Sequence, residues 1–218
     1  LVVGAALLLR PSDAGAAPLP RATVSRPRGT DRRLPLVLAA SALIQASHSL
    51  LYGFSTLQWS AAGLSGLSIG ALWAVGVLAE IVLFAWSARL PASISSPLPM
   101  LILGAAGGAV RWAGMALDPA PAWLPWLQGL HGLSFGAAHL GAVQFVARAA
   151  APGRAASAQG SLAWVNGLAM AGATAASGLL YEAFGAAAYA AMAALAAAGG
   201  ACALLAWRIG ARSGAGTP

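Results

Sequence analysis

Residues 67–90 read LSIGALWAVGVLAEIVLFAWSARL, a mostly apolar run with a single acidic residue, Glu80. A helix of this length spans a hydrocarbon layer of about 30 Å, because each residue adds about 1.5 Å. Glu80 then lies about 20 Å from the start of the helix, close to the centre of the layer. A charged acid costs roughly 2.5 to 3.5 kcal/mol there, so membrane proteins pair it, protonate it or face it into water. The stretch therefore predicts a membrane-spanning helix with a functional acid near its middle.

The composition places the whole chain among membrane proteins. Of its 218 residues, 59% are hydrophobic and 8% are charged, whereas about a quarter of the residues in soluble domains are charged. Several apolar runs exceed about 18 residues, the length that predicts a membrane-spanning helix. We therefore predict an all-α, polytopic membrane protein. The lone cysteine, Cys202, excludes a disulfide framework and no metal-ligand spacing is present, so no metal or cofactor is expected.

Six apolar segments follow one another with short links, which favours antiparallel neighbours. They cover residues 34–61, 67–90, 97–117, 121–147, 155–181 and 186–207. Residues 1–9 are interpreted as the end of an earlier membrane helix, residues 10–33 as a basic connector and residues 208–218 as a tail. Because the chain begins with Leu1 rather than methionine, we expect it to be a fragment.

The arginines predict how the segments are oriented. All twelve basic residues are arginines, and eleven of them lie in the connector, in alternate links or in the tail. Positive charge gathers on the cytoplasmic side of membrane proteins. We therefore expect the connector and the C-terminus to be cytoplasmic at the inner (plasma) membrane. The arginines would face anionic lipid head groups, and no nucleic-acid partner is expected.

The twelfth arginine, Arg111, lies inside the third segment and needs a counter-ion or an aqueous cavity. Glu80 is the sole acid well inside a segment, so we predict a pair between Glu80 and Arg111. In the alternative, Arg111 reaches the outer surface and Glu80 stays protonated. In the fourth segment, His131, Phe135 and His139 have the i, i+4, i+8 spacing of one helical face. Such histidines either relay protons or only pack, and we expect His131 to be functional.

Several stretches resemble transporters of the major facilitator superfamily. They are HSLLYGFSTLQW at 48–59, GLSxxxIGALWAVGVLAEIVLF at 63–84, RW at 111–112 and LQGLHGLSFGAAHLGAVQF at 127–145. Together they are similar to the second half of the 3-phenylpropionate transporter type, which is related to lactose permease. The resemblance runs from Pro35 to the end of the chain. It implies the six-helix C-terminal bundle of a twelve-helix fold, with the solute site at mid-membrane between two halves.

The resemblance also implies roles for three residues. Glu80 matches an eighth-helix acid of lactose permease that acts in sugar binding and coupling, Arg111 matches a ninth-helix arginine important to proton release, and His131 matches the tenth-helix histidine. The chain departs from that pattern at Ser134, where lactose permease has its proton-coupling acid. The seventh-helix aspartates and the tenth-helix lysine also have no charged match. If protons are carried, Glu80 and His131 are the titratable candidates.

These observations predict a secondary active transporter, not an enzyme, that carries a small organic solute such as an aromatic carboxylate together with protons. Its partners would be the solute, protons, the lipid bilayer and an N-terminal six-helix half. During alternating access, Glu80 would alternate between a protonated state and a pair with Arg111, for which a solute carboxylate would compete. The predicted proton-coupling residues are Glu80, His131 and Arg111. The predicted solute-binding residues are His48, Tyr52, Glu80, Arg111, Gln128, His131 and Asn166.

Two other functions compete with transport. Ser65 within GLSG and His139 two segments later are similar to the serine–histidine dyad of rhomboid intramembrane proteases, in which histidine is the general base. A four-residue match in a glycine-rich chain is a weak signal. A six-helix fragment could also be a non-catalytic membrane scaffold, although a scaffold gains little from charge buried in the membrane.

Overall fold

The computed structural model describes residues 31–214, so the expectations for residues 1–30 and 215–218 lie outside the described residues. Within the described range every regular element is a helix, and the predicted all-α class is confirmed. In chain order the elements are α2 (Leu34–Ala46), α3 (Ser49–Ala61), α4 (Gly66–Ser87), α5 (Ala92–Ser95), α6 (Pro97–Ala116), η1 (Pro121–Trp123), α7 (Leu124–Gly129), η2 (Gly132–Ala137), α8 (Ala138–Ala149), α9 (Ala155–Phe184), η3 (Gly185–Ala188) and α10 (Tyr189–Gly214).

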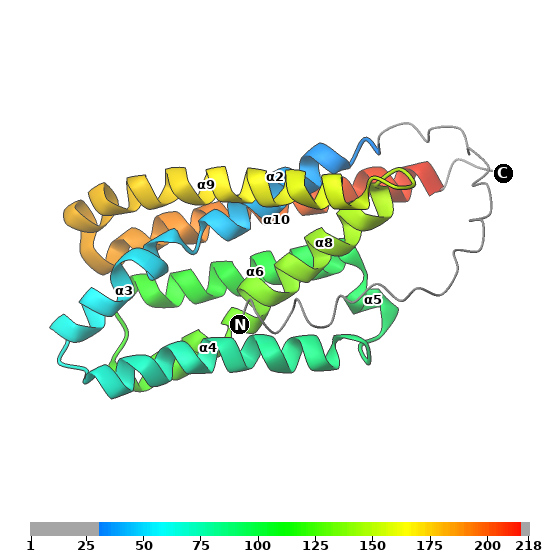
Figure 1. Ribbon diagram of the computed structural model, residues 1–218. Coiled ribbons are helices and arrows are strands. Elements are labelled where there is room, and N and C mark those ends of the chain that lie inside the picture. The colour runs from blue at the N-terminus through cyan, green and yellow to red at the C-terminus, as the bar shows by residue number, and fades with distance from the viewer. Residues whose placement is uncertain (1–30, 215–218) are drawn as a thin grey trace, which may run out of the picture.

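These elements form helical rods at the predicted apolar segments. The rods are α2 with α3, then α4, α6, α7 with η2 and α8, α9, and α10. In the described range, four helical stretches are long and apolar enough to cross a membrane: Leu34–Ala61, Gly66–Ser87, Pro97–Ala116 and Ala155–Arg212. The last stretch holds both α9 and α10, which are joined by a turn at η3 and both pack against α2 (Figure 1). The chain is thus a polytopic helical membrane protein.

Some helix ends differ from the predicted boundaries. The segment predicted to end at residue 90 ends as a helix at Ser87, because Pro91 disfavours helical geometry in the residue before it. The last helix continues to Gly214, beyond the predicted end at residue 207. The turn before it uses Gly185 at φ 54°, a backbone conformation that side chains rarely adopt.

The rods are arranged unevenly around the bundle. Helix α10 packs against α2 and α6, and α6 also packs against α8. Helix α4 lies at one edge of the bundle, away from α2, α9 and α10 (Figure 1), and is held mainly by α7 and η2. Its buried residues are Ile69, Leu72 and Gly76, so most of its surface is open.

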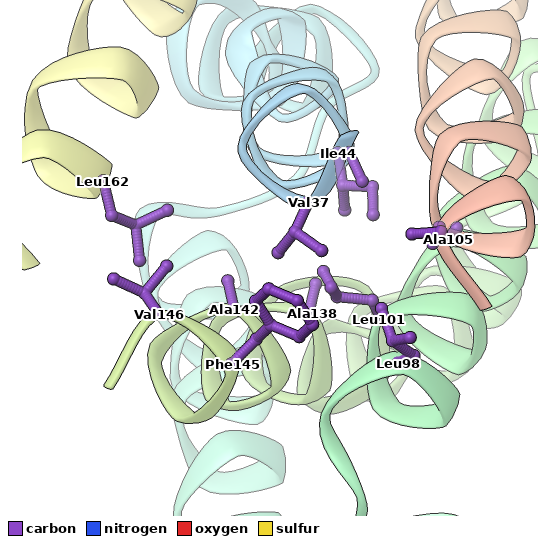
Figure 2. Close-up of a cluster of buried hydrophobic side chains, with 13 residues drawn as sticks. Val37, Ile44, Leu98, Leu101, Ala105, Ala138, Ala142, Phe145, Val146 and Leu162 are labelled. Carbon is purple, nitrogen blue, oxygen red and sulfur yellow. The ribbon is translucent and has the colours of Figure 1, made fainter. Parts of the chain in front are cut away.

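Two apolar clusters hold the bundle together. One joins α2, α6, α8, α9 and α10, and Figure 2 shows Val37, Ile44, Leu101 and Phe145 pointing into it. The other contains Leu50, Leu51, Trp112, Tyr189 and Met192, among other residues. Between α6 and α8 the backbones approach closely, since a Cβ added at Gly104 would lie 2.7 Å from the Cβ of Ala138. Close contact through small residues replaces the hydrophobic effect as the packing force in lipid.

The start of α2 is tied to the end of α8. The Arg33 guanidinium donates hydrogen bonds of 2.7 to 3.2 Å to the Asp31 carboxylate and lies 5.2 Å from the centre of the Phe145 ring. These hydrogen bonds hold the pKa of Asp31 below its ordinary value. The arginine therefore contacts α8 at the end of the bundle at which α5 and the last turns of α8 and α10 also lie (Figure 1).

A break at Ser47 and His48 divides the first predicted segment into α2 and α3. The carbonyl oxygen of Ile44 accepts hydrogen bonds from the Ser47 hydroxyl at 2.6 Å and from the His48 Nδ1 at 3.0 Å. The backbone N–H of His48 instead donates to Gln45, one residue nearer than in an α-helix. Side chains thus compete with the backbone for one carbonyl, and the helix is interrupted there.

The fourth rod contains a π-helix. Element η2 separates α7 from α8 and carries the sequence GLSFGA. Such wide turns are rare and frequent at functional sites. Here the turn packs against both α4 and α6. A Cβ added at Gly132 would lie 2.7 Å from the Ala79 carbonyl oxygen, and one at Gly107 would lie 2.8 Å from the Leu133 Cβ.

Candidate functional site

Arg111 is buried on α6, with 1% of its surface exposed. Its Nη1 donates to the Nδ1 of His131 at 2.7 Å and to the Ser134 hydroxyl at 3.2 Å, and its Nη2 donates to the Gln128 amide oxygen. The guanidinium carbon lies 4.6 Å from the centre of the Trp112 ring. The cation is therefore held by uncharged neighbours.

His131 connects Arg111 to the predicted acid. Its Nε2 lies 2.6 Å from the Glu80 carboxylate oxygen Oε1. The prediction of a direct pair between Glu80 and Arg111 is therefore wrong, because the imidazole ring lies between them. Two glycines border this pair at ordinary contact distance: the ring is 3.4 Å from a Cβ built at Gly76, and Glu80 Cγ is 3.6 Å from one built at Gly136.

The chemistry of the donors assigns the hydrogen on His131. A guanidinium only donates hydrogen bonds, so Nδ1 of His131 must accept and carries no hydrogen. The hydrogen of the neutral ring is then on Nε2 and points at the Glu80 carboxylate. Glu80 is the more open member of this row, with 20% of its side chain exposed against 9% for His131.

A second row of hydrogen bonds leaves Arg111 in the opposite direction. The Ser134 hydroxyl, which accepts from Arg111, lies 3.2 Å from Nε2 of His48. Because Nδ1 of His48 donates to the Ile44 carbonyl, its Nε2 is an acceptor and Ser134 is the donor. The two histidines therefore carry their hydrogens on different nitrogens. Arg111 is the donor at the head of both rows.

Gln128 attaches the same cation to α4. Its amide oxygen accepts from Arg111, and its Nε2 donates to the Leu72 carbonyl oxygen at 3.2 Å. Gln128 is 2% exposed and Leu72 is 5% exposed, so this hydrogen-bonded connection between Arg111 and α4 is shielded from the surface. Arg111 thus links α6 to α4, to α7 with η2, and through Ser134 to the break between α2 and α3.

Aromatic rings border the Glu80–His131 pair on the open side of the bundle. Tyr52, which is 44% exposed, has its ring centre 6.0 Å from that of Trp73 and 6.4 Å from that of His131. On the other side the Phe135 ring stacks on His131 at 5.2 Å and on His139 at 5.9 Å. The predicted shared face of His131, Phe135 and His139 is confirmed. Aromatic rings thus lie on both sides of the histidine that contacts the carboxylate.

The structure brings most of the predicted solute-binding residues together. The group comprises His48, Tyr52, Glu80, Arg111, Gln128 and His131. Asn166 is separate, because no hydrogen bond in the described part of the chain joins it to this group. Its amide oxygen is buried without a partner on α9. Arg111 is also too buried in this conformation for a solute to reach it, so competition for Arg111 requires the site to rearrange.

The sequence marks Ser134 as a departure from the lactose permease pattern, but neither a role for it in the site nor the break at Ser47 was predicted. Ser134 is uncharged and lies between Gly132 and Gly136, a pattern that hydropathy does not distinguish from packing. The adjacent Ser47 and His48 could have been read as a break, since both side chains can hydrogen-bond a preceding carbonyl.

The structure does not assemble the protease dyad. Ser65 is at the start of α4, where its hydroxyl accepts from the backbone N–H of Ser68 at 3.2 Å. His139 is on α8 with its ring stacked on Phe135. Among residues 31–214 no hydrogen bond joins Ser65 to His139. A general base must reach its nucleophile, so this arrangement does not favour a hydrolase.

Comparison with known proteins agrees with this architecture. Residues 30–191 match the family described as the MFS_1 like family. The chain is 41% identical over 110 residues to the protein of Escherichia coli (strain K12) named "Probable 3-phenylpropionic acid transporter". That similarity covers 50% of this chain but 29% of the relative's length. No solved structure matches. Because the family match covers most of the helical bundle and its buried charged site, the chain belongs to the MFS_1 like family.

Proposed function

We propose that the chain is part of a secondary active transporter that carries a small organic solute together with protons by alternating access. The row Arg111–His131–Glu80 is the observation that carries this proposal. Ionisable side chains inside a membrane bundle are expensive and mark substrate or proton pathways. Membership of the MFS_1 like family supports transport as the activity.

The row can hold a proton in a second arrangement. A proton added to neutral His131 occupies Nδ1, whose lone pair accepts from Arg111. The imidazolium N–H then faces the guanidinium, two cations repel each other, and Arg111 leaves. The attraction between His131 and the Glu80 carboxylate increases at the same time, because the imidazolium is charged. Protonation therefore exchanges an Arg111–His131 contact for an ion pair between His131 and Glu80.

The solute we propose is an aromatic carboxylate. The name of the Escherichia coli relative specifies an aryl-substituted acid. In this chain the rings of Tyr52, Trp73 and Phe135 border the acid–histidine pair. An anionic solute is repelled by ionised Glu80 and attracted by Arg111 once Arg111 is released. Proton uptake would therefore precede solute binding and favour it.

The remaining parts of the proposal concern the assembly. Alternating access in transporters moves one helical bundle against another around a central site. The open faces of α3 and α4, which carry Tyr52 and Glu80, are where an N-terminal six-helix half would pack. We propose an inner-membrane location, with the arginine-bearing links and the C-terminus in the cytoplasm.

Substitution of Glu80 tests the proposal. In the full-length native protein, Glu80→Gln removes the charge that stabilises an imidazolium at His131 while keeping the side-chain volume. We expect loss of solute accumulation driven by a pH gradient, with exchange of solute across the membrane retained. The matched control is Glu182→Gln, an exposed acid at the end of α9. Unchanged pH-driven accumulation by Glu80→Gln would contradict the proposal.

A further inference from the structure

Arg111, which contacts His131, is also connected through Ser134 to the break between α2 and α3. One Nη1 of Arg111 donates both to His131 at 2.7 Å and to Ser134 at 3.2 Å. Ser134 continues to His48 at 3.2 Å, and His48 continues to the Ile44 carbonyl at 3.0 Å. Ser134 and His48 are fully buried, so water does not substitute for these bonds. The row therefore runs without interruption from the proton site to the end of α2.

Each hydrogen bond in this row has a defined direction. Arg111 donates to Ser134, the single hydroxyl hydrogen of Ser134 donates to His48, and His48 donates to Ile44. The last bond helps to maintain the break, because the Ile44 carbonyl is occupied by side chains rather than by the His48 backbone N–H. Through these hydrogen bonds, the position of Arg111 is connected to the Ile44 carbonyl in the last turn of α2.

We propose that Ser134 and His48 are positioning residues that transmit the release of Arg111 to the α2–α3 break, so that α3 reorients relative to α2 when His131 takes up a proton. This rests on the proposed function in one respect, since it takes His131 as the residue that binds a proton. The proton adds to Nδ1 of His131, and no covalent bond breaks. Arg111 then withdraws Nη1 from both acceptors. Ser134 is no longer held by Arg111, so its hydroxyl can turn away and the hydrogen bond from Ser134 to His48 is weakened.

The charges around His131 indicate which of its neighbours is displaced when the ring takes up a proton. The titratable or charged side chains that face it are Glu80 from α4, Arg111 from α6, His48 at the break and Tyr52 from α3. Glu80 favours the proton on His131, whereas Arg111 opposes it. Arg111 is the one that also contacts Ser134. The displaced partner is therefore the one connected to the break.

A distance measurement in the full-length protein tests the proposal. Spin labels are placed at Leu57→Cys on α3 and Arg208→Cys on α10, both exposed, in a background where Cys202 and any other cysteine are replaced. Helix α10 serves as the reference because it packs along α2. Distances are recorded in lipid nanodiscs from about pH 8 down to about pH 4, a range that extends well below the ordinary pKa of histidine because Arg111 opposes protonation of His131.

We expect a pH-dependent shift of the α3–α10 distance in the otherwise unchanged protein and loss of that shift in Ser134→Ala. His48→Phe, which keeps the ring contacts but removes both nitrogens, should lose the shift as well and serves if Ser134→Ala does not fold. The control is Ser177→Ala, which removes a buried hydroxyl 2.9 Å from Ser49 on α3 but lies outside the row from Arg111. It should retain the shift.

Three outcomes decide the matter. A full shift in both Ser134→Ala and His48→Phe overturns the link, and so does an equal loss in Ser177→Ala, which would indicate general loosening of α3. A shift that Ser134→Ala abolishes, in a protein whose solute uptake ignores a pH gradient, supports the link and contradicts the proposed proton-coupled function instead.

Discussion

At Arg111 the chain buries a positive charge whose immediate partners are a neutral histidine, a serine and an amide. The cost of this charge explains why the surrounding residues are so constrained, since removing one partner leaves a buried donor unsatisfied. Glu80 compensates it through the His131 ring and not by contact. The three residues therefore become more buried along the row. Glu80 is the most exposed, His131 lies behind it, and Arg111 is the most buried.

Tyr52 is the ring most open to a solute beside Glu80, with 44% of its surface exposed. If the solute is an aryl carboxylate, Tyr52→Leu should raise its KM by roughly 2- to 10-fold, since aromatic pairs contribute about 0.5–1.5 kcal/mol. The KM of an aliphatic carboxylate of similar size should change less. Trp164→Leu, an exposed ring on α9, is the control and should alter neither value. Equal effects on both solutes would exclude ring stacking at Tyr52.

Much of this site could be predicted from single residues. An acid, an arginine and a histidine inside apolar segments can be recognised as candidate site residues from the sequence, because burying ionisable groups in a membrane is costly. The position of His131 between Glu80 and Arg111 could not, because it depends on how α4 and η2 rotate against each other around Gly76 and Gly132. Asn166 met the same polarity criterion but belongs to α9, which packs mainly against α2, α3 and α8 rather than against α4, α6 or η2.

Among the elements, η2 decides how close α4 comes to the rest of the bundle. A Cβ at Gly132 would lie 2.7 Å from the carbonyl oxygen of Ala79 and 2.9 Å from its carbonyl carbon, so the backbone of α4 would have to move. Gly132→Ala should lower the stability by about 1–3 kcal/mol. It should also weaken the His131–Glu80 contact, because Glu80 lies on α4 and His131 directly precedes η2.

Thermal unfolding of the purified full-length protein measures this effect. Gly129→Ala is the control in the same rod, because nothing lies within 4 Å of a Cβ built there. Both substitutions favour a helix intrinsically by up to about 1 kcal/mol. The difference between the two variants therefore isolates the clash with α4. A Gly132→Ala protein as stable as Gly129→Ala would show that α4 is not held against η2 in solution.

The break in the first rod and the wide turn in the fourth were not predicted. Hydropathy measures whether a stretch prefers lipid, and it is unaffected when Ser47 and His48 redirect one carbonyl. It is equally insensitive to the wider turn at η2. Both features depend on local hydrogen bonding, and they meet at the His48–Ser134 contact.

On the scale of the whole molecule, apolar length and arginine placement predicted the six segments, because lipid requires backbone groups to be satisfied within each helix. The structure gathers α5 and the last turns of α8 and α10 at one end (Figure 1). Arg89, Arg148 and Arg212 lie in or next to these elements. The opposite end holds the link with Asp118 and Pro121.

Labelling of intact cells tests the proposed orientation. In a cysteine-free full-length background, Ala120→Cys should react with a membrane-impermeant maleimide added outside the cells. Ala88→Cys, which keeps the neighbouring Arg89, should react only after the membrane is permeabilised, because positive links stay in the cytoplasm. Both positions are exposed in the structure, so access depends on the side of the membrane. The reverse pattern would invert the proposed topology.

The wide turn at η2 also has a consequence for comparing this chain with its relatives. In a regular α-helix each four-residue step rotates a side chain by about 40°, so His139 would point about 80° away from His131. The wider turn absorbs part of that rotation and keeps His131, Phe135 and His139 in one stack. In a sequence alignment it behaves as a single inserted residue. A relative without the wide turn should therefore need a one-residue gap between positions 130 and 138, and its following helix would present a different side to the rest of the bundle.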